Sequence, residues 1–216
     1  MEGLSHGERT GATVTNPRTA ERRRIRRTEL LDAARRVFVD RGYFETRVAD
    51  IVAAAGCSQG TFYLYFTSKD DVLHALLEVL VEDLYAASLA PRPRPEEPIR
   101  ALEATIRQFM HAYRDRAGLI RILEQVASFS PDFLTLRLEI KSRFTALIEA
   151  GVRGQGHAGA GRPDARYLAQ ALGAMVEDMA YTSYVLTAPL DEQEAVSTMA
   201  FIWLQAVGAG APLPTS

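Results

Sequence analysis

The sequence predicts an all-α protein, with an N-terminal three-helix head that contains a helix-turn-helix and a C-terminal helical bundle. Apolar residues recur at helical spacing in one segment after another, and no stretch shows a convincing two-residue alternation. Hydrophobic residues make up 47% of the 216 residues and charged residues 24%, as in ordinary soluble globular proteins. This length suits one large domain or two modest ones.

The composition argues against several classes of protein. The single cysteine, Cys57, rules out an internal disulfide framework and suits a reducing compartment. No apolar run approaches the roughly 20 residues that span a bilayer. The N-terminal residues lack the apolar core of a secretory signal. We therefore expect a cytoplasmic protein that makes no membrane contact.

Residues 1–21 are expected to form a disordered arm, because they are rich in Gly, Thr and Ser. Six arginines crowd the end of this arm and the residues after it, opposed locally only by Glu21: Arg18, Arg22, Arg23, Arg24, Arg26 and Arg27. Alone, such a run is most often a solvated surface. Beside a helix-turn-helix, however, a basic arm can reach the phosphates or a groove of DNA.

The first helix is expected from about Arg24 to Arg41. Its apolar stripe consists of Leu30, Leu31, Ala34, Val37 and Phe38. Gly42 then ends the helix. This helix should pack on the helix-turn-helix and so complete the three-helix head.

Residues 46–69 contain two short helices joined by a tight turn. The first helix has one apolar face, formed by Val48, Ile51 and Val52. Gly56 follows where the chain needs a residue that tolerates positive φ. Ser58 is a natural N-cap for a second helix over residues 59–66. Two helices around a glycine-containing turn form the helix-turn-helix pattern.

At these positions the sequence resembles the DNA-binding signature of TetR-family transcriptional repressors, over residues 24–80. The matching residues are Gly42, Tyr43, Thr46, Val48, Ile51, Ala55, Gly56, Ser58, Gly60, Thr61, Phe62, Tyr63, Tyr65, Phe66, Ser68, Lys69 and Leu73. Two positions depart from the signature. Arg47 stands where the family more often has a second Thr or Ser, so we expect Thr46 to cap the first helix of the motif. Cys57 replaces the usual Val or Ile in the turn.

The resemblance implies that the head binds double-stranded DNA. The residues expected to contact it are Arg24, Thr46, Arg47, Ser58, Gln59, Gly60, Thr61, Tyr63, Tyr65 and Lys69. The polar side chains of the second helix should contact base edges or phosphates, whereas Arg47, Ser58 and Lys69 should contact phosphates, which position the protein without specifying sequence. Gly60 should allow the helix to approach the duplex closely.

A long fourth helix is expected to follow Ser68, which acts as its N-cap with Asp71 three residues on. Its apolar face runs to about Ala87, so it links the head to everything downstream and is the expected lever of a switch. Residues 89–98 hold four prolines and are expected to form a semi-rigid linker. The expected domains are an arm (1–21), a helix-turn-helix domain (22–68), a connecting helix (69–90) and a ligand-binding and dimerisation domain (91–216).

Five further helices are predicted from the apolar spacing in the last domain. They cover approximately residues 102–114, 119–130, 131–151, 163–186 and 191–207, with a flexible loop at 154–162. Pro131 can open the third of them at its first turn.

The resemblance implies that this domain binds a small molecule, and the apolar side chains suggest a largely apolar one. Large, adaptable side chains on successive helices are the candidates, although ordinary core packing is the more frequent role for each. They are Phe109, Met110, Tyr113, Phe129, Phe133, Met175 and Met179. Asp178 lies beside an apolar face, where a carboxylate must be exposed, paired or directed at a polar ligand group.

A second subunit is the other partner that the resemblance implies, through a four-helix interface. The candidate interface is the small-residue surface around Ala169 and Gly173, together with Phe201 and Trp203 on the last helix. A two-fold dimer reads a palindromic operator, with recognition helices about 34 Å apart or a multiple of that.

Enzyme motifs do not support a competing function. Residues 154–159 match the dinucleotide fingerprint literally, but no strand precedes them and Pro163 interrupts the segment after them. The four histidines show no metal-ligand spacing, and no nucleophile elbow frames a serine. We therefore expect no catalytic residue, metal or cofactor, and predict a ligand-responsive homodimeric repressor. An activator with the same head, or an enzyme or small-molecule carrier built in the bundle, remains the alternative.

Overall fold

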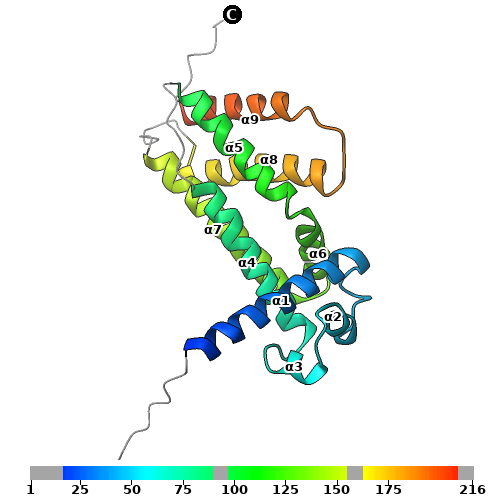
Figure 1. Ribbon diagram of the computed structural model, residues 1–216. Helices are drawn as coiled ribbons and strands as arrows, with labels where there is room; N and C mark the ends of the chain where they lie inside the picture. Colours follow the sequence, from blue (N-terminus) through cyan, green and yellow to red (C-terminus); the bar gives the residue numbers. More distant parts are fainter. Residues whose placement is uncertain (1–16, 90–96, 155–162, 209–216) are drawn as a thin grey trace, which may run out of the picture.

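The computed structural model describes residues 17–89, 97–154 and 163–208. Within these ranges the chain forms nine α-helices and no β-strand, so the all-α prediction is confirmed (Figure 1). The helices are α1 (Pro17–Arg41), α2 (Val48–Ala54), α3 (Gln59–Tyr63), α4 (Lys69–Leu89), α5 (Pro98–Arg114), α6 (Ala117–Ala127), α7 (Pro131–Gly154), α8 (Ala165–Tyr184) and α9 (Glu192–Val207). Most of the expected arm, linker and flexible loop, at 1–16, 90–96 and 155–162, lies outside the described residues.

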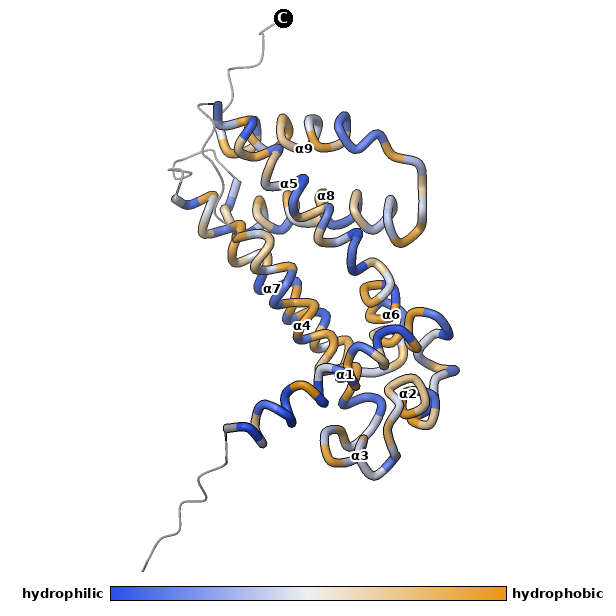
Figure 2. The backbone as a smooth tube through the Cα atoms, in the orientation of Figure 1, coloured by the Kyte–Doolittle hydropathy of each residue, from blue (hydrophilic) through white to orange (hydrophobic). Residues whose placement is uncertain are grey.

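Helix α1 begins at Pro17, earlier than the expected start near Arg24. Its N-terminal half projects away from the rest of the molecule (Figure 1) and is predominantly hydrophilic (Figure 2). Two ion pairs stabilise this half locally, each between residues three positions apart: Arg24 with Glu21 and Arg26 with Glu29. Residues 17–23, which were expected to belong to the arm or precede the helix, are therefore helical.

Helices α1, α2 and α3 form the head around an apolar centre. Phe38 of α1, Ile51 of α2 and Phe62 of α3 have no exposed surface. Their side chains belong to one apolar core that continues through α4 into the helices of the bundle. The head is therefore packed onto the rest of the chain rather than tethered to it.

Helix α4 carries the chain from the head into the bundle (Figure 1). Ser68 caps it as expected, because its Oγ accepts a hydrogen bond from the backbone N–H of Asp71 at 3.1 Å. The Asp71 carboxylate accepts instead from the backbone N–H of Thr67 at 2.8 Å, one residue before the expected partner. Pro98, which was expected in the linker, stands in the first turn of α5, where the missing N–H costs nothing.

The bundle consists of α5 to α9. Helix α7 packs on α6 and α8, and α5 packs on α4, α8 and α9. The N-caps of α8 and α9 are Asp164 and Asp191, whose carboxylates accept backbone N–H groups at 2.8 and 3.0 Å. No helix within the described ranges combines the length and the apolar character needed to cross a membrane.

The head is joined to the bundle through α6 as well as through α4. At Gly118 of α6, an added Cβ would lie 2.9 Å from a methyl carbon of Val39 in α1, so the two helices approach too closely for a side chain. At the other end of α6, the ring of Phe129 packs edge-on against Phe44 in the α1–α2 turn, with centroids 5.5 Å apart. Both ends of α6 thus contact the head.

Candidate nucleic-acid interface and bundle cavity

The turn between α2 and α3 is formed by local hydrogen bonds. The backbone N–H of Arg47 donates to the Asp50 carboxylate at 2.8 Å at the start of α2. Gly56 adopts φ +60° in the turn, as expected from its type. Ser58 then caps α3, since its Oγ accepts from the backbone N–H of Thr61 at 3.1 Å. The two-helix geometry at these residues therefore follows from the sequence over a few positions.

Helix α3 presents its polar residues to solvent and buries a single aromatic ring. Phe62 is fully buried, whereas the next residue, Tyr63, is 57% exposed. Gln59 and Gly60 are exposed on the same short helix. A large aromatic side chain held outside the core, beside an exposed amide, provides hydrogen-bonding and stacking groups for an external partner.

No close contact among the described residues requires glycine at position 60. A Cβ at this position would meet only the Oγ of Ser58, at 3.7 Å, which is ordinary van der Waals contact. Glycine in a helix also lowers stability relative to alanine. A requirement for glycine here would therefore have to come from close approach of another molecule.

Three other residues expected to contact DNA, at or near α3, also interact within the chain. The hydroxyl groups of Ser58 and Thr61 lie 3.0 Å apart and share a hydrogen bond. Tyr65 follows the helix and is half-buried, with the guanidinium of Arg23 6.0 Å from its ring centroid. Both hydroxyls and the Tyr65 ring remain at the surface beside Tyr63.

The basic residues of α1 lie next to this surface. Arg23 approaches the Tyr65 ring, and the guanidinium of Arg27, one turn later, lies 5.2 Å from the Phe66 ring centroid. Arg24 is paired with Glu21 at 2.7 Å, but both side chains are largely exposed. Exposed pairs of this kind contribute little to stability and exchange readily for another anion. Arg23 and Arg27 of α1 therefore adjoin the exposed face of α3, and together they form a basic and aromatic surface, the recognition surface.

Two of the expected DNA contacts are instead part of the fold. Thr46 is 1% exposed and donates its hydroxyl to the carbonyl oxygen of Gly42 at 2.7 Å, so it neither caps α2 nor reaches an external phosphate. The cap residue of α2 is Arg47, whose side chain is exposed and remains a candidate contact. The expectation for Thr46 was wrong because its buried position lets its hydroxyl satisfy the end of α1.

Lys69 was expected to contact a phosphate, but its ammonium group points back at the α1–α2 turn. Its Nζ donates to the carbonyl oxygens of Tyr43 and Thr46, both at 2.9 Å, and lies 4.4 Å from the centroid of the Tyr43 ring. The neighbouring Asp70 accepts a hydrogen bond from the Tyr43 hydroxyl. Burial, together with this bond, raises the pKa of Tyr43 well above its usual value. Lys69 and Asp70 therefore fasten the turn to the start of α4.

We expect Lys69→Met to destabilise the protein by about 2–3 kcal/mol, because hydrogen bonds from a charged donor are lost while the aliphatic stem is kept. Urea unfolding measures this change, with Arg35→Met on the exposed side of α1 as the control. A phosphate contact would give the opposite result: unchanged stability and a weaker salt dependence of DNA binding.

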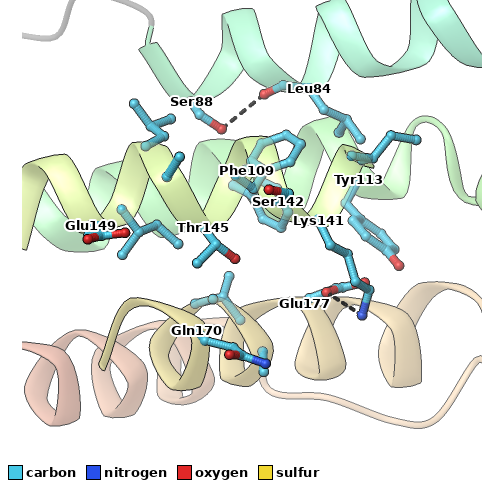
Figure 3. A pocket seen from close by; sticks show the side chains of 18 of the residues that line it. Leu84, Ser88, Phe109, Tyr113, Lys141, Ser142, Thr145, Glu149, Gln170 and Glu177 are labelled. Carbon is cyan, nitrogen blue, oxygen red and sulfur yellow. Dashed lines mark hydrogen bonds and ion pairs between the residues drawn. The ribbon is translucent and has the colours of Figure 1, made fainter. Parts of the chain in front are cut away.

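The bundle contains a cavity of about 790 Å³ between α4, α5, α7 and α8 (Figure 3). Its size is within the range of small-molecule sites. Phe109 and Tyr113, one turn apart on α5, line it as expected. Burial raises the pKa of Tyr113 well above its usual value, with Glu177 and Glu124 adding to the effect.

The other expected ligand contacts lie elsewhere. Met110 is fully buried, and Met175 and Met179 pack into the core; none of the three lines the cavity. Phe133 is buried near the head, with its ring stacked on His74 at 4.4 Å. Phe129 is 77% exposed and its ring packs against Phe44, and Asp178 is exposed. None of these six residues lines the cavity, whose α8 wall is formed by other residues, such as Gln170, Ala174 and Glu177.

Two ion pairs at the cavity were missed in the sequence. Lys141 of α7 pairs with Glu177 of α8 at 3.1 Å, as Figure 3 shows, and Arg137 of α7 pairs with Glu124 of α6 at 2.6 Å. All four residues line the cavity. The only local signal is the i, i+4 spacing of the two basic residues on α7, since their partners come from other helices.

Three of the four residues expected at the subunit interface instead pack within the chain or line the cavity. Ala169 is fully buried inside the chain, and a Cβ at Gly173 would lie 3.0 Å from a methyl carbon of Ile148, so both residues serve the packing within the bundle. Trp203 is partly buried and lines the cavity. Phe201, in contrast, is 51% exposed on α9. Of the four expected residues, Phe201 alone remains a clear candidate for contact with a second subunit.

Both parts of the chain are similar to known bacterial regulators. Residues 30–76 match the family described as bacterial regulatory proteins, tetR family, and residues 102–209 match the C-terminal domain of the transcriptional regulator EthR. The chain is 27% identical over 201 residues to the HTH-type transcriptional regulator EthR of Mycolicibacterium smegmatis, covering 88% of this chain and 90% of the relative. It is 31% identical over 134 residues to the HTH-type transcriptional repressor KstR2 of Rhodococcus jostii, covering 59% and 66%.

Solved structures share the fold. A transcriptional regulator from Rhodococcus sp. Rha1 superimposes with a TM-score of 0.67 at 24% identity, covering 83% of this chain and 96% of that chain. The fatty acid degradation regulator FadR from Bacillus halodurans gives a TM-score of 0.67 at 19% identity, covering 83% and 94%.

Proposed function

Because the chain belongs to the TetR family of transcriptional regulators, we propose that it is a homodimeric repressor that acts in the cytoplasm and binds a palindromic operator until a small molecule enters the bundle cavity. The observation that carries the proposal is the recognition surface: Tyr63 and Gln59 stand exposed on a helix whose buried Phe62 fixes it to the head. DNA reading is assigned to the head and effector binding to the bundle.

Two connections between the cavity and the head support a ligand-dependent switch. Leu80 and Leu84 of α4 line the cavity, while Leu73 of the same helix is buried in the core beside the head. Leu123 of α6 also lines the cavity, and Phe129 just beyond α6 contacts the head. A ligand that displaces α4 or α6 therefore moves a helix on which the head rests. It can weaken DNA binding only by as much as it prefers the conformation that does not bind DNA.

The test of DNA recognition begins with selection of bound sites from a random-sequence duplex library by the purified chain. We expect the enriched sequences to be palindromic, because an isologous dimer presents the same recognition surface twice. Enrichment of a single half-site, or of no sequence, would contradict the proposed dimeric operator complex.

The affinity for the selected duplex should fall steeply with salt, with a log–log slope of about −0.9 for each phosphate neutralised. Replacing Arg23 and Arg27, which lie beside α3, by Gln should flatten this slope by about 0.9 for each phosphate that is no longer neutralised. Arg153→Gln, in an exposed ion pair at the far end of α7, is the control and should leave the slope unchanged. An unaltered slope in the double variant would remove α1 from the DNA interface.

A further inference from the structure

The cavity has mainly apolar walls and charged groups at both ends. Tyr113 is 4% exposed and lines the cavity, yet its hydroxyl makes no hydrogen bond with any residue that the structure describes. Figure 3 shows this hydroxyl beside Lys141 and Glu177 at one end of the cavity, with Glu149 at the other. A hydroxyl that is accessible from a cavity, on a side chain that is otherwise buried, is available to a ligand.

The charges around Tyr113 are already matched. Lys141 is paired with Glu177 at 3.1 Å and Arg137 with Glu124 at 2.6 Å, and the side chains of both pairs are partly buried. A ligand carboxylate that paired with Lys141 would leave Glu177 without its cation. A ligand ammonium that paired with Glu177 would leave Lys141 without its anion. Separating a partly buried pair carries a desolvation penalty that an uncharged ligand avoids.

Tyr113 is suited to act as a hydrogen-bond donor. Burial raises the pKa of its hydroxyl, and the nearby carboxylates of Glu177 and Glu124 raise it further, so the phenol keeps its proton at neutral pH. A neutral phenol donates one hydrogen bond. The matching ligand group is therefore an uncharged acceptor, such as the carbonyl of an ester, ketone, lactone or amide.

The rest of the cavity is long and mainly apolar. It follows α7 from Arg137 to Val152, a distance of roughly 22 Å at about 1.5 Å per residue. Phe109, Phe144 and Ile148 are among the apolar side chains that line this length. An extended hydrocarbon chain has the shape and polarity to occupy it.

We propose that the cavity binds an elongated, uncharged molecule whose carbonyl accepts a hydrogen bond from Tyr113 while its hydrocarbon chain lies along α7. This inference deepens the proposed function, on which it rests for the role of the ligand as effector. It assigns to Tyr113 the selection of a neutral acceptor, and to the two ion pairs the rejection of charged ends.

Three probes with the same ten-carbon chain test the charge selection: methyl decanoate, decanoate and decylamine. Trp203, the single tryptophan of the chain, lines the cavity, so its fluorescence reports occupancy in the full-length protein. Methyl decanoate should bind at least about tenfold more tightly than either charged probe at neutral pH. Tighter binding of decanoate or decylamine, or no binding of the ester, would overturn the inference. Arg166→Gln would then show whether an anion is held at the exposed end of α8 instead.

Tyr113→Phe tests the hydrogen bond, because it removes one hydroxyl oxygen and keeps the ring. Affinity for methyl decanoate should fall about 3- to 10-fold, whereas affinity for decanoate should not change. Tyr85→Phe is the matched control: its ring packs against Phe144 of the cavity wall, but the residue does not line the cavity. Equal ester affinity in Tyr113→Phe and the unmodified protein would overturn the assignment.

Parallel measurement of operator release separates this inference from the proposed function. Ester binding that depends on Tyr113 but leaves the operator bound would support the ligand class and contradict ligand-controlled repression. Operator release by the ester that persists unchanged in Tyr113→Phe would support ligand-controlled repression and overturn the role of Tyr113.

Discussion

Tyr63→Ala is expected to weaken operator binding strongly while leaving the protein folded. Tyr63 is 57% exposed, so its truncation should change the free energy of unfolding by less than about 1 kcal/mol. A side chain that reads a base contributes about 1–3 kcal/mol of discrimination. A two-fold dimer loses this contribution twice, and operator affinity should therefore fall at least roughly 30-fold.

The adjacent residue provides the sharpest comparison. Phe62 has no exposed surface, and Phe62→Ala should destabilise the protein by about 3–5 kcal/mol, because it empties part of the head core. Urea unfolding and fluorescence polarisation of a labelled operator, carried out on both variants, distinguish the two roles. A loss of stability in Tyr63→Ala comparable to that in Phe62→Ala would mean that Tyr63 acts in the core and not at the DNA.

The helix-turn-helix was predictable because its determinants are local. Gly56 takes the positive φ that its position requires, and Ser58 bonds to a residue three positions later. Neither feature depends on distant parts of the chain. The early start of α1 was missed for a related reason: its projecting half has no apolar stripe to bury, and is supported by pairs such as Glu21 with Arg24, which a search for apolar periodicity ignores.

The cavity could not be located in the same way. Large apolar side chains such as Met175 were the expected lining, but Met175 packs into the core, and neighbouring residues of α8 such as Ala174 and Glu177 line the cavity instead. The pairing of Lys141 with Glu177 depends on how α7 and α8 pack, which no short sequence window contains. Lys69 was misassigned likewise, since its partner Tyr43 stands 26 positions earlier in the chain.

Small residues on α8 also had two interpretations that the sequence could not separate. Close approach of helices requires small side chains whether the neighbouring helix belongs to the same chain or to a second subunit. The structure uses Ala169 and Gly173 within the chain, with Gly173 directly beneath Ile148 of α7. The exposed aliphatic and aromatic side chains that remain on α8 and α9 are therefore better candidates for an interface: Tyr167, Phe201 and Ile202.

Phe201→Arg is expected to convert the proposed dimer into a monomer. Phe201 is 51% exposed and stands beside Ile202, which is 43% exposed, so two apolar side chains face outward on one turn of α9. A buried aromatic anchor at an interface typically contributes about 2 kcal/mol or more. In an isologous dimer the substitution is made twice, which weakens dimerisation by about 4 kcal/mol, or roughly a thousandfold.

Sedimentation velocity and operator polarisation should therefore change together in Phe201→Arg: the mass falls toward that of one chain, and affinity falls because a single head contacts only one half-site. Phe129→Arg is the matched control, since Phe129 is 77% exposed but lies at the junction of head and bundle. That variant should keep the sedimentation mass of the unmodified protein. If Phe201→Arg also keeps it, the interface lies on another face, and if the unmodified protein sediments as a single chain, the dimeric operator complex has to form on the DNA itself.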